Sequence, residues 1–357
     1  MKVAYGVHGY GRGHSSRAMA VLPELTARHD VLVLAGDDAF HALSGEYPVV
    51  RIPTFRYELA QGGRRAKRRT LVSGIPKLLD LHLHGPALEL VCQSLRDFGP
   101  DVIVSDSEAW THWAGRRMGI PRISFDHFGA LVYCDWPMPP RDRWVCRMEA
   151  AAYEQMMGGE PDRKVVVSFY DVPPRGPGVC VVGPVLRDAV LRVGPSRGEF
   201  LMVYFSNGPF HFNPRVEGAL RELDLPVVIY GVGREGVDGN LDFRPPSNTR
   251  FVEDLAAARA VFATAGNQLI SEALHLRKPL LLLPEDSLEQ RLNAAAVQCM
   301  GIGMRTSRRR VDADQLRAFL ASEPRYLASF PDRPADGRAQ AVEAIERFAA
   351  ELAVPST

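Results

Sequence analysis

Short apolar runs alternate with longer segments in which apolar residues recur every three or four positions, from the first residues of the chain to beyond residue 290. Apolar runs bounded by Gly, Pro or Asp are typical of buried strands, and the longer periodic segments are typical of amphipathic helices. The strands predicted from this pattern are Val3–Val7, Val31–Ala35, Val49–Ile52, Asp101–Ser105, Pro121–Phe125, Phe200–Phe205, Val227–Tyr230, one reaching Phe262 and one ending at Leu283. The alternation predicts an α/β fold with parallel sheets.

Helices are predicted between these strands and at the end of the chain. The segments concerned are Ser15–Arg28, Ile75–Phe98, Trp110–Met118, one after Pro214, one opening at Gly266, one near Glu289 and Gly337–Leu352. Residues 53–76 show no clear element and carry a basic run, Arg64–Arg69. Segments of that length without an element are usually functional loops or disordered.

The chain has 357 residues, a length natural for two domains. Gly and Pro gather around Gly176–Arg197, which we interpret as the interdomain linker. The pattern therefore predicts a first Rossmann-like domain over residues 1–182, a linker over 183–197, a second Rossmann-like domain over 198–336, and a C-terminal helix over 337–357 that can cross back onto the first domain. In two doubly wound halves, the ligand crevice is expected at the carboxyl ends of the strands, between the domains.

Composition narrows the function classes. A formal net charge of +1 gives no overall attraction to nucleic acid or membranes, so no nucleic-acid partner is expected. No apolar run approaches the ~20 residues that span a bilayer, and the start of the chain leads straight into a strand without a signal peptide. We expect a cytoplasmic protein. The five cysteines are scattered and form no CxxC, which argues against a disulfide framework or a zinc site.

The stretch from Phe262 to Asn293 carries the strongest chemical signal. Gly266 opens a helix, where unpaired N–H groups and the positive end of the helix dipole favour a phosphate. Glu272 follows within reach of a group lying along that helix, such as a ribose. Glu289 and Gln290 then stand at the mouth of the next helix. An ordinary βαβ unit with a polar helix start is the alternative interpretation.

A glycine loop, Gly9 to Gly13, lies between the first strand and the first helix and is followed by His14. Glycines there allow the backbone to approach a ligand closely. Gly9-x-Gly11, with Asp37 after the second strand, also fits a nicotinamide-cofactor fingerprint. However, His14 occupies the third glycine position of that fingerprint, which disfavours a dehydrogenase.

The Gly-x-Gly-x-Gly-His loop and the 262–294 segment together resemble the MurG-like group of GT-B glycosyltransferases. The resemblance implies two Rossmann-like domains with an interdomain cleft, the first binding the acceptor and the second the donor. It implies a hexosyltransferase-class enzyme that moves a sugar, with inversion and without a metal, from a UDP- or TDP-linked donor to a hydroxyl of a small molecule or glycan. The nucleoside-diphosphate sugar is a co-substrate, and no cofactor is expected.

On the first domain, the resemblance makes His14 the leading general base or acceptor-orienting residue, since the pKa of imidazole lies near working pH. Polar residues that follow two predicted strands could orient His14 or act as the base themselves. These catalytic candidates are Asp106, Asp126 and His127. The acceptor-side candidates are Gly11, Gly13 and Glu108, and the carboxylate of Glu108 could also be the base or orient His14. A helix N-cap is the alternative for Asp106 and for His14.

On the second domain, the resemblance assigns a role to each part of the donor. The base is expected against the backbone of Phe251 and Val252. The diphosphate is expected on glycine-containing loops, the ribose on Glu272 and the sugar hydroxyls on Glu289 and Gln290. The residues of the diphosphate loops are Ser206, Asn207, Gly208, Gly266 and Asn267. The DxD sequence Asp312–Asp314 is interpreted as a helix cap, and no metal site is expected.

The acceptor is left open, because segments 53–90 and 128–165 do not resemble MurG and the first loop lacks its Gly-Gly-x-Gly-Gly-His form. The run Arg64–Arg69 would suit an anionic acceptor or peripheral contact with an anionic membrane, and equally a solvated loop. Two other functions remain: a nucleotide-sugar hydrolase, whose first loop is similar to Gly11–Arg17, and a non-catalytic partner protein of the same fold.

Overall fold

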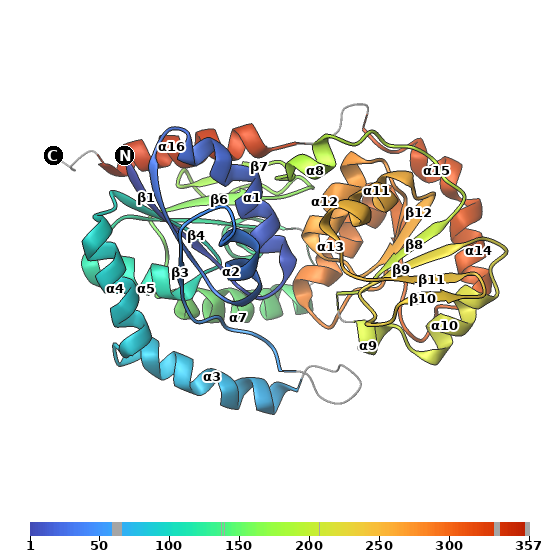
Figure 1. Cartoon of the computed structure of the whole chain (residues 1–357), viewed down its shortest axis with the longest axis horizontal. Helices are drawn as coiled ribbons and strands as arrows, with labels where there is room; N and C mark the ends of the chain where they lie inside the picture. Colours follow the sequence, from blue (N-terminus) through green and yellow to red (C-terminus); the bar gives the residue numbers. More distant parts are fainter. Residues whose placement is uncertain (59–65, 137, 139, 207, 332–335, 354–357) are drawn as a thin grey trace. The chain divides into compact units, whose positions relative to one another are not determined.

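The computed structural model describes residues 1–58, 66–136, 138, 140–206, 208–331 and 336–353. The chain divides into two compact units (Figure 1). Of the described residues, unit 1 contains those within 1–187 and 336–353, and unit 2 contains those within 188–331.

Unit 1 is built on a seven-stranded parallel sheet with the order β3-β2-β1-β4-β5-β6-β7. Its strands are β1 Lys2–Val7, β2 Asp30–Ala35, β3 Val49–Arg51, β4 Val102–Asp106, β5 Arg122–Asp126, β6 Arg163–Val167 and β7 Val179–Val182. The chain runs outward from β1 to β3 and then returns to place β4 on the other side of β1. In doubly wound sheets, ligands bind at the carboxyl ends of the strands at such a switch point.

Helices cover both faces of this sheet. They are α1 Arg12–Thr26, α2 Asp37–Leu43, α3 Lys67–His82, α4 Pro86–Phe98, α5 Ala109–Met118, α6 Gly129–Tyr133, α7 Pro140–Met156 and α16 Arg338–Ala353. One core joins β1 to α1 and α16, with Leu25 and Phe348 buried in it. The core on the opposite face joins β4 to α4 and α5 and includes Leu95 and Trp110. The last helix, α16, therefore belongs to unit 1.

The predicted helix Ile75–Phe98 is wrong as a single element. The structure has two helices, α3 and α4, because His84 takes a left-handed φ of 55° and Pro86 then starts a new helix. Helix α3 also begins eight residues before the predicted start, so Lys67–Arg69 lies in a helix rather than a loop; residues 64 and 65 lie outside the described residues.

Unit 2 has a second seven-stranded sheet, in the order β10-β11-β9-β8-β12-β13-β14. Its strands are β8 Leu201–Tyr204, β9 Val227–Tyr230, β10 Gly236–Asp238, β11 Leu241–Arg244, β12 Ala260–Ala263, β13 Leu280–Leu282 and β14 Gly303–Arg305. All neighbours pair in parallel except the β10–β11 hairpin, which the sequence pattern did not predict. The switch point of this sheet lies between β8 and β12.

The helices of unit 2 are α8 Asp188–Leu191, α9 Gly208–His211, α10 Pro214–Arg221, α11 Asn248–Ala257, α12 Asn267–His275, α13 Leu288–Cys299, α14 Ala313–Ala321 and α15 Glu323–Leu327. Within the described parts of both units, no helix combines the length and apolarity that crossing a membrane requires.

Candidate active site

The glycine loop of unit 1 follows β1 at the switch point of the first sheet. A Cβ atom on Gly9 would lie 2.3 Å from the carbonyl oxygen of Gly36, so the loop reaches the turn after β2 only because residue 9 is glycine. Gly11, at φ 87°, is the N-cap of α1 and has no side-chain cap. The loop therefore places His14 in the first turn of α1, beside the end of β4.

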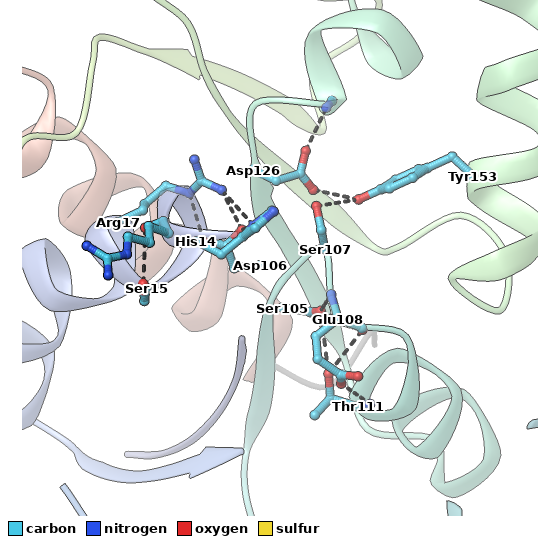
Figure 2. A network of polar contacts seen from close by, with 12 residues as sticks. His14, Ser15, Arg17, Ser105, Asp106, Ser107, Glu108, Thr111, Asp126 and Tyr153 are labelled. Carbon is cyan, nitrogen blue, oxygen red and sulfur yellow. Dashed lines mark hydrogen bonds and ion pairs between the residues drawn. The ribbon is translucent and has the colours of Figure 1, made fainter. Parts of the chain in front are cut away.

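His14 pairs with Asp106, the last residue of β4 (Figure 2). Its Nδ1 lies 2.7 Å from Asp106 Oδ1. Arg17, one turn further along α1, holds the same carboxylate at two points, with Nε 2.8 Å from Oδ2 and Nη2 2.5 Å from Oδ1. Asp106 is fully buried.

The charge state of Asp106 fixes the chemistry of His14. Burial acts to raise the pKa of the Asp106 carboxyl, but Arg17 and His14 outweigh burial, and the pKa falls below its usual value. An ionised carboxylate only accepts hydrogen bonds, so Nδ1 of His14 is the donor. In the neutral imidazole the lone pair then lies on Nε2. The side chain of His14 remains 25% exposed, so the pair combines a fixed carboxylate with a partly exposed imidazole.

Asp126 and His127, the other two catalytic candidates, follow β5 and are held by neighbours within unit 1. Asp126 accepts the Gly129 N–H at 2.6 Å and the Tyr153 hydroxyl at 2.8 Å, and burial raises its pKa. His127 Nδ1 donates to the Val167 carbonyl at 2.7 Å. The dyad that forms is His14–Asp106, whereas Asp126 pairs with Tyr153.

Glu108 caps α5. Its two carboxylate oxygens accept the N–H groups of Trp110 and Thr111, at 2.9 and 2.7 Å. Burial raises the pKa of Glu108 to about 7. The alternative interpretation of Asp106 as a helix N-cap is wrong, because the N-cap of α5 is Glu108, two residues further on. The acceptor-side role of Glu108 stays a prediction, as do those of Gly11 and Gly13 in the glycine loop.

In unit 2, the main chains of the loops after β8 and β9 are in direct contact. A Cβ atom on Gly208 would lie 2.0 Å from the Gly231 carbonyl oxygen, and one on Gly231 would lie 2.3 Å from that of Phe205. Beside Gly208, the Ser206 hydroxyl donates to Glu285 at 2.8 Å. Asn207 lies outside the described residues.

The start of α12 is open. Gly266 is its N-cap, no side chain caps the helix, and a Cβ atom on Gly266 would meet nothing within 4 Å. Asn267 is 8% exposed, and no described residue offers a hydrogen bond to its buried Oδ1. Unsatisfied first-turn N–H groups at the positive end of a helix bind anions. The uncapped N–H groups at the start of α12 therefore suit a phosphate.

The polar residues around the start of α12 form hydrogen bonds with one another and with the neighbouring loops. Glu272 is buried and accepts from Gln268 Nε2 at 3.1 Å. Gln290 Oε1 accepts the N–H groups of Ala265 and Glu285, at 3.0 and 2.9 Å, and so joins the loops after β12 and β13. Glu289 lies beside it in the first turn of α13. The ribose and sugar contacts predicted for these residues stay predictions.

Phe251 and Val252 lie inside α11, whose N-cap is Ser247. Backbone groups within a helix are committed to bonds along the helix. The predicted contact of a nucleotide base with their backbone therefore does not suit this conformation. The ring of Phe251 instead packs edge-on against Tyr204 and Tyr230.

The DxD sequence is a cap, as predicted, because Asp312 accepts the Gln315 N–H at 2.9 Å at the start of α14. Over the residues that the structure describes, no group of three or more His, Cys, Asp or Glu side chains is placed to hold a metal ion.

Sequence reasoning gave no role to Arg17, Tyr153 or Gln268. Arg17 could have been found from its spacing, because it follows His14 by three residues and residues three apart on a helix lie on the same face. Tyr153 lies 27 residues from Asp126 on another helix, and no local pattern links the two.

Comparison with known proteins gives one family over most of the chain. The family model described as glycosyl transferase family 1 matches residues 1–324. No curated protein matches the chain.

Among solved structures, the glycotransferase of kitacinnamycin is similar, with 18% identity, 98% of this chain and 99% of that chain covered, and a TM-score of 0.70. UGT89C1 of Arabidopsis thaliana complexed with UDP has 16% identity, coverage of 99% and 100%, and a TM-score of 0.67. MurG of Acinetobacter baumannii has 16% identity, coverage of 97% and 99%, and a TM-score of 0.60. These likenesses show that the fold is GT-B.

Proposed function

This chain belongs to glycosyl transferase family 1, and from that premise we propose that it transfers a sugar with inversion, and without a metal, from a UDP- or TDP-linked donor to a hydroxyl of a small molecule or glycan. That it is a glycosyltransferase using a nucleotide sugar follows from the family. The proposal adds the stereochemistry of the transfer, its independence from a metal and the class of acceptor.

The observation that carries the proposal is the His14–Asp106 pair. Nε2 of His14 takes the proton of the acceptor hydroxyl as its oxygen attacks the anomeric carbon of the sugar. The bond from that carbon to the diphosphate oxygen breaks, and the nucleoside diphosphate leaves with the electron pair. Asp106 stabilises the imidazolium that forms. A positioned base of this kind contributes about 10²–10⁴ in rate. Direct displacement at one carbon inverts its configuration.

The open start of α12 supports the placement of the leaving group. Negative charge develops on the diphosphate, and preorganised N–H groups stabilise such charge in a transition state. A helix terminus alone contributes about 0.3–2 kcal/mol, so the side-chain amide of the neighbouring Asn267 would add a hydrogen bond. The UDP named in the similar Arabidopsis structure supports a uridine-linked donor.

Calorimetry with UDP, TDP, GDP, ADP and NAD tests the donor class. We expect one diphosphate to bind the wild type and to bind Glu272→Ala much more weakly, while Glu253→Ala, on the exposed surface of α11, binds as the wild type. Binding of NAD alone would contradict the proposal. Once an acceptor is found, the anomeric coupling in proton NMR reports inversion, and turnover in excess EDTA reports metal independence.

A further inference from the structure

The sheet of unit 2 ends in a strand with an open edge. Strand β14 is last in the order of the sheet and pairs with β13 on one side. The bonds to β13 include the Ile302 carbonyl, at 3.2 Å from its donor, and the Thr306 N–H, at 2.8 Å from its acceptor. Main-chain groups of a strand alternate in direction, so those of Gly303 and Arg305 face the open side.

A cavity of about 770 Å³ lies along this edge. Its walls are formed by α13, by the segment 304–310 and by α14 and α15, all of which belong to unit 2. Cavities of roughly 300–1,000 Å³ accommodate small molecules, and the polar groups on their walls decide which molecule fits. We call this space the β14 cavity.

The charged side chains on the walls of the β14 cavity are all cationic. They are Arg291, Arg305, Arg310 and Arg325, and none of the described residues that line the cavity is Asp or Glu. Arg291 lies 3.7 Å from Asp286. The other three arginines form no ion pair with a residue that the structure describes. Several uncompensated charges of one sign in a concave surface attract a ligand of the opposite sign.

The carboxylates nearest to these arginines in sequence are engaged elsewhere. Asp312, two residues from Arg310, caps α14. Glu323, two residues from Arg325, is buried and pairs with Arg197 at 2.6 Å. The positive charge of the β14 cavity is therefore not balanced from within unit 2.

We propose that the β14 cavity binds a small anion that carries at least two phosphate or carboxylate groups. The planar guanidinium of arginine matches both groups, because it offers two parallel N–H donors to a pair of oxygens. The Ser307 hydroxyl and the main-chain N–H of Arg305 are further donors at the same edge. The inference does not rest on the proposed sugar transfer.

The donor itself is the other candidate occupant. Arg291 follows Gln290, whose side chain joins the loops after β12 and β13, so the cavity adjoins the predicted donor site. However, the open helix start that suits the donor phosphate follows β12, and β14 lies two strands away in the sheet. Two strand spacings amount to about 10 Å. A second molecule therefore fits the β14 cavity better than the diphosphate of the donor does.

Calorimetry of the full chain with inorganic pyrophosphate and with citrate, at constant ionic strength, tests the proposal. We expect at least one of these anions to bind the wild type, and the stronger one shows whether phosphate or carboxylate is recognised. Binding should persist in Gly266→Ala, which alters the start of α12. In the double substitution Arg305→Gln with Arg310→Gln the affinity should fall about tenfold or more, because two charge-assisted contacts are lost.

Arg309→Gln is the matched control. It removes one charge from the same run of arginines, and Arg309 does not line the cavity, so the variant should bind as the wild type does. Thermal unfolding shows that each variant is folded. UDP affinity should be unchanged in the double variant, and a wild type that binds pyrophosphate or citrate but not UDP would contradict the proposed function alone.

Three results would overturn the proposal. The first is that neither anion binds the wild type, since the arginines are then merely solvated. The second is that Arg309→Gln weakens binding as much as the double variant does, which would show a general effect of charge. The third is that Gly266→Ala abolishes binding, since the anion would then occupy the donor site.

Discussion

Arg17 and Asp106 stand 89 residues apart in sequence and form a two-point ion pair at the end of β4. Both side chains are buried. One carboxylate oxygen of Asp106 is shared by the guanidinium of Arg17 and the imidazole of His14. The ion pair therefore keeps the Asp106 carboxylate ionised and holds it in the direction that orients His14. Arg17 is thus a positioning residue for the proposed base.

We expect Arg17→Met to destabilise unit 1 by about 3–5 kcal/mol at neutral pH, because it leaves the Asp106 charge buried without a partner. The depressed pKa of Asp106 contributes stability that is present above the carboxyl's unfolded pKa, about 3.9, and is lost as pH falls through the folded value. In Arg17→Met, burial without the guanidinium raises the pKa of Asp106, so the folded variant takes up a proton and regains stability as pH falls from 7, and the difference in unfolding free energy between wild type and variant narrows towards pH 4. Urea unfolding at pH 7 and pH 4 measures it. Adding Asp106→Asn to the variant should recover part of the loss; equal stability of wild type and Arg17→Met would contradict the expectation.

His14→Ala should lower kcat by about 10²–10⁴ with the dissociation constant for the nucleoside diphosphate unchanged, since the proposed base acts on the acceptor. Asp106→Asn should cause a loss of similar size. The amide can donate to Nδ1 and leave the proton on Nε2, which removes the base. Steady-state kinetics together with calorimetry of UDP separates the two effects. Retention of most of kcat in His14→Ala would rule out this histidine as the base.

The sequence predicts that these polar side chains lie at one edge of the sheet, but it does not predict which of them pairs with His14. Asp106, Glu108 and Asp126 all follow predicted strands whose carboxyl ends share one sheet edge, so each was a reasonable partner for His14. The choice depends on side-chain direction, which packing decides. Arg17 draws Asp106 to His14, whereas the left-handed Ser107, at φ 51°, turns the chain so that Glu108 caps α5.

Three elements escaped prediction for different physical reasons. The apolar period continues through Leu83, but the left-handed conformation of His84 ends α3 and Pro86 starts α4. Strand β7 lies within the Gly- and Pro-rich segment whose composition is typical of a linker. The β10–β11 hairpin has an exposed outer strand of three residues, too short for an alternating pattern.

Gly208 and Gly266 should respond differently to alanine. At Gly208 the new Cβ would lie 2.0 Å from a backbone oxygen and 2.5 Å from the Val232 Cα, so the backbone must move, and we expect a loss of stability of about 1–3 kcal/mol. At Gly266 the φ of −72° suits alanine and nothing lies within 4 Å, so stability should not change. The methyl group would instead stand at the open start of α12, and diphosphate affinity should fall about tenfold or more. Thermal unfolding and UDP calorimetry on both variants check the contrast, which an unchanged affinity in Gly266→Ala would refute.

His112, buried in α5, should make the protein sensitive to acid. Burial, with Arg122 nearby, lowers the pKa of His112 to about 3. The unfolded chain binds a proton at this residue below about pH 6.5 while the folded chain does not, so stability falls as pH drops from 6.5 towards 3. In His112→Leu that loss disappears. The variant should gain about 2 kcal/mol relative to the wild type between pH 7.5 and pH 5, measured by urea unfolding at both values. His41→Leu, which replaces an exposed histidine, is the control and should follow the wild type. If His112→Leu and the wild type lose stability in parallel, the histidine is protonated in the folded state and the assignment is wrong.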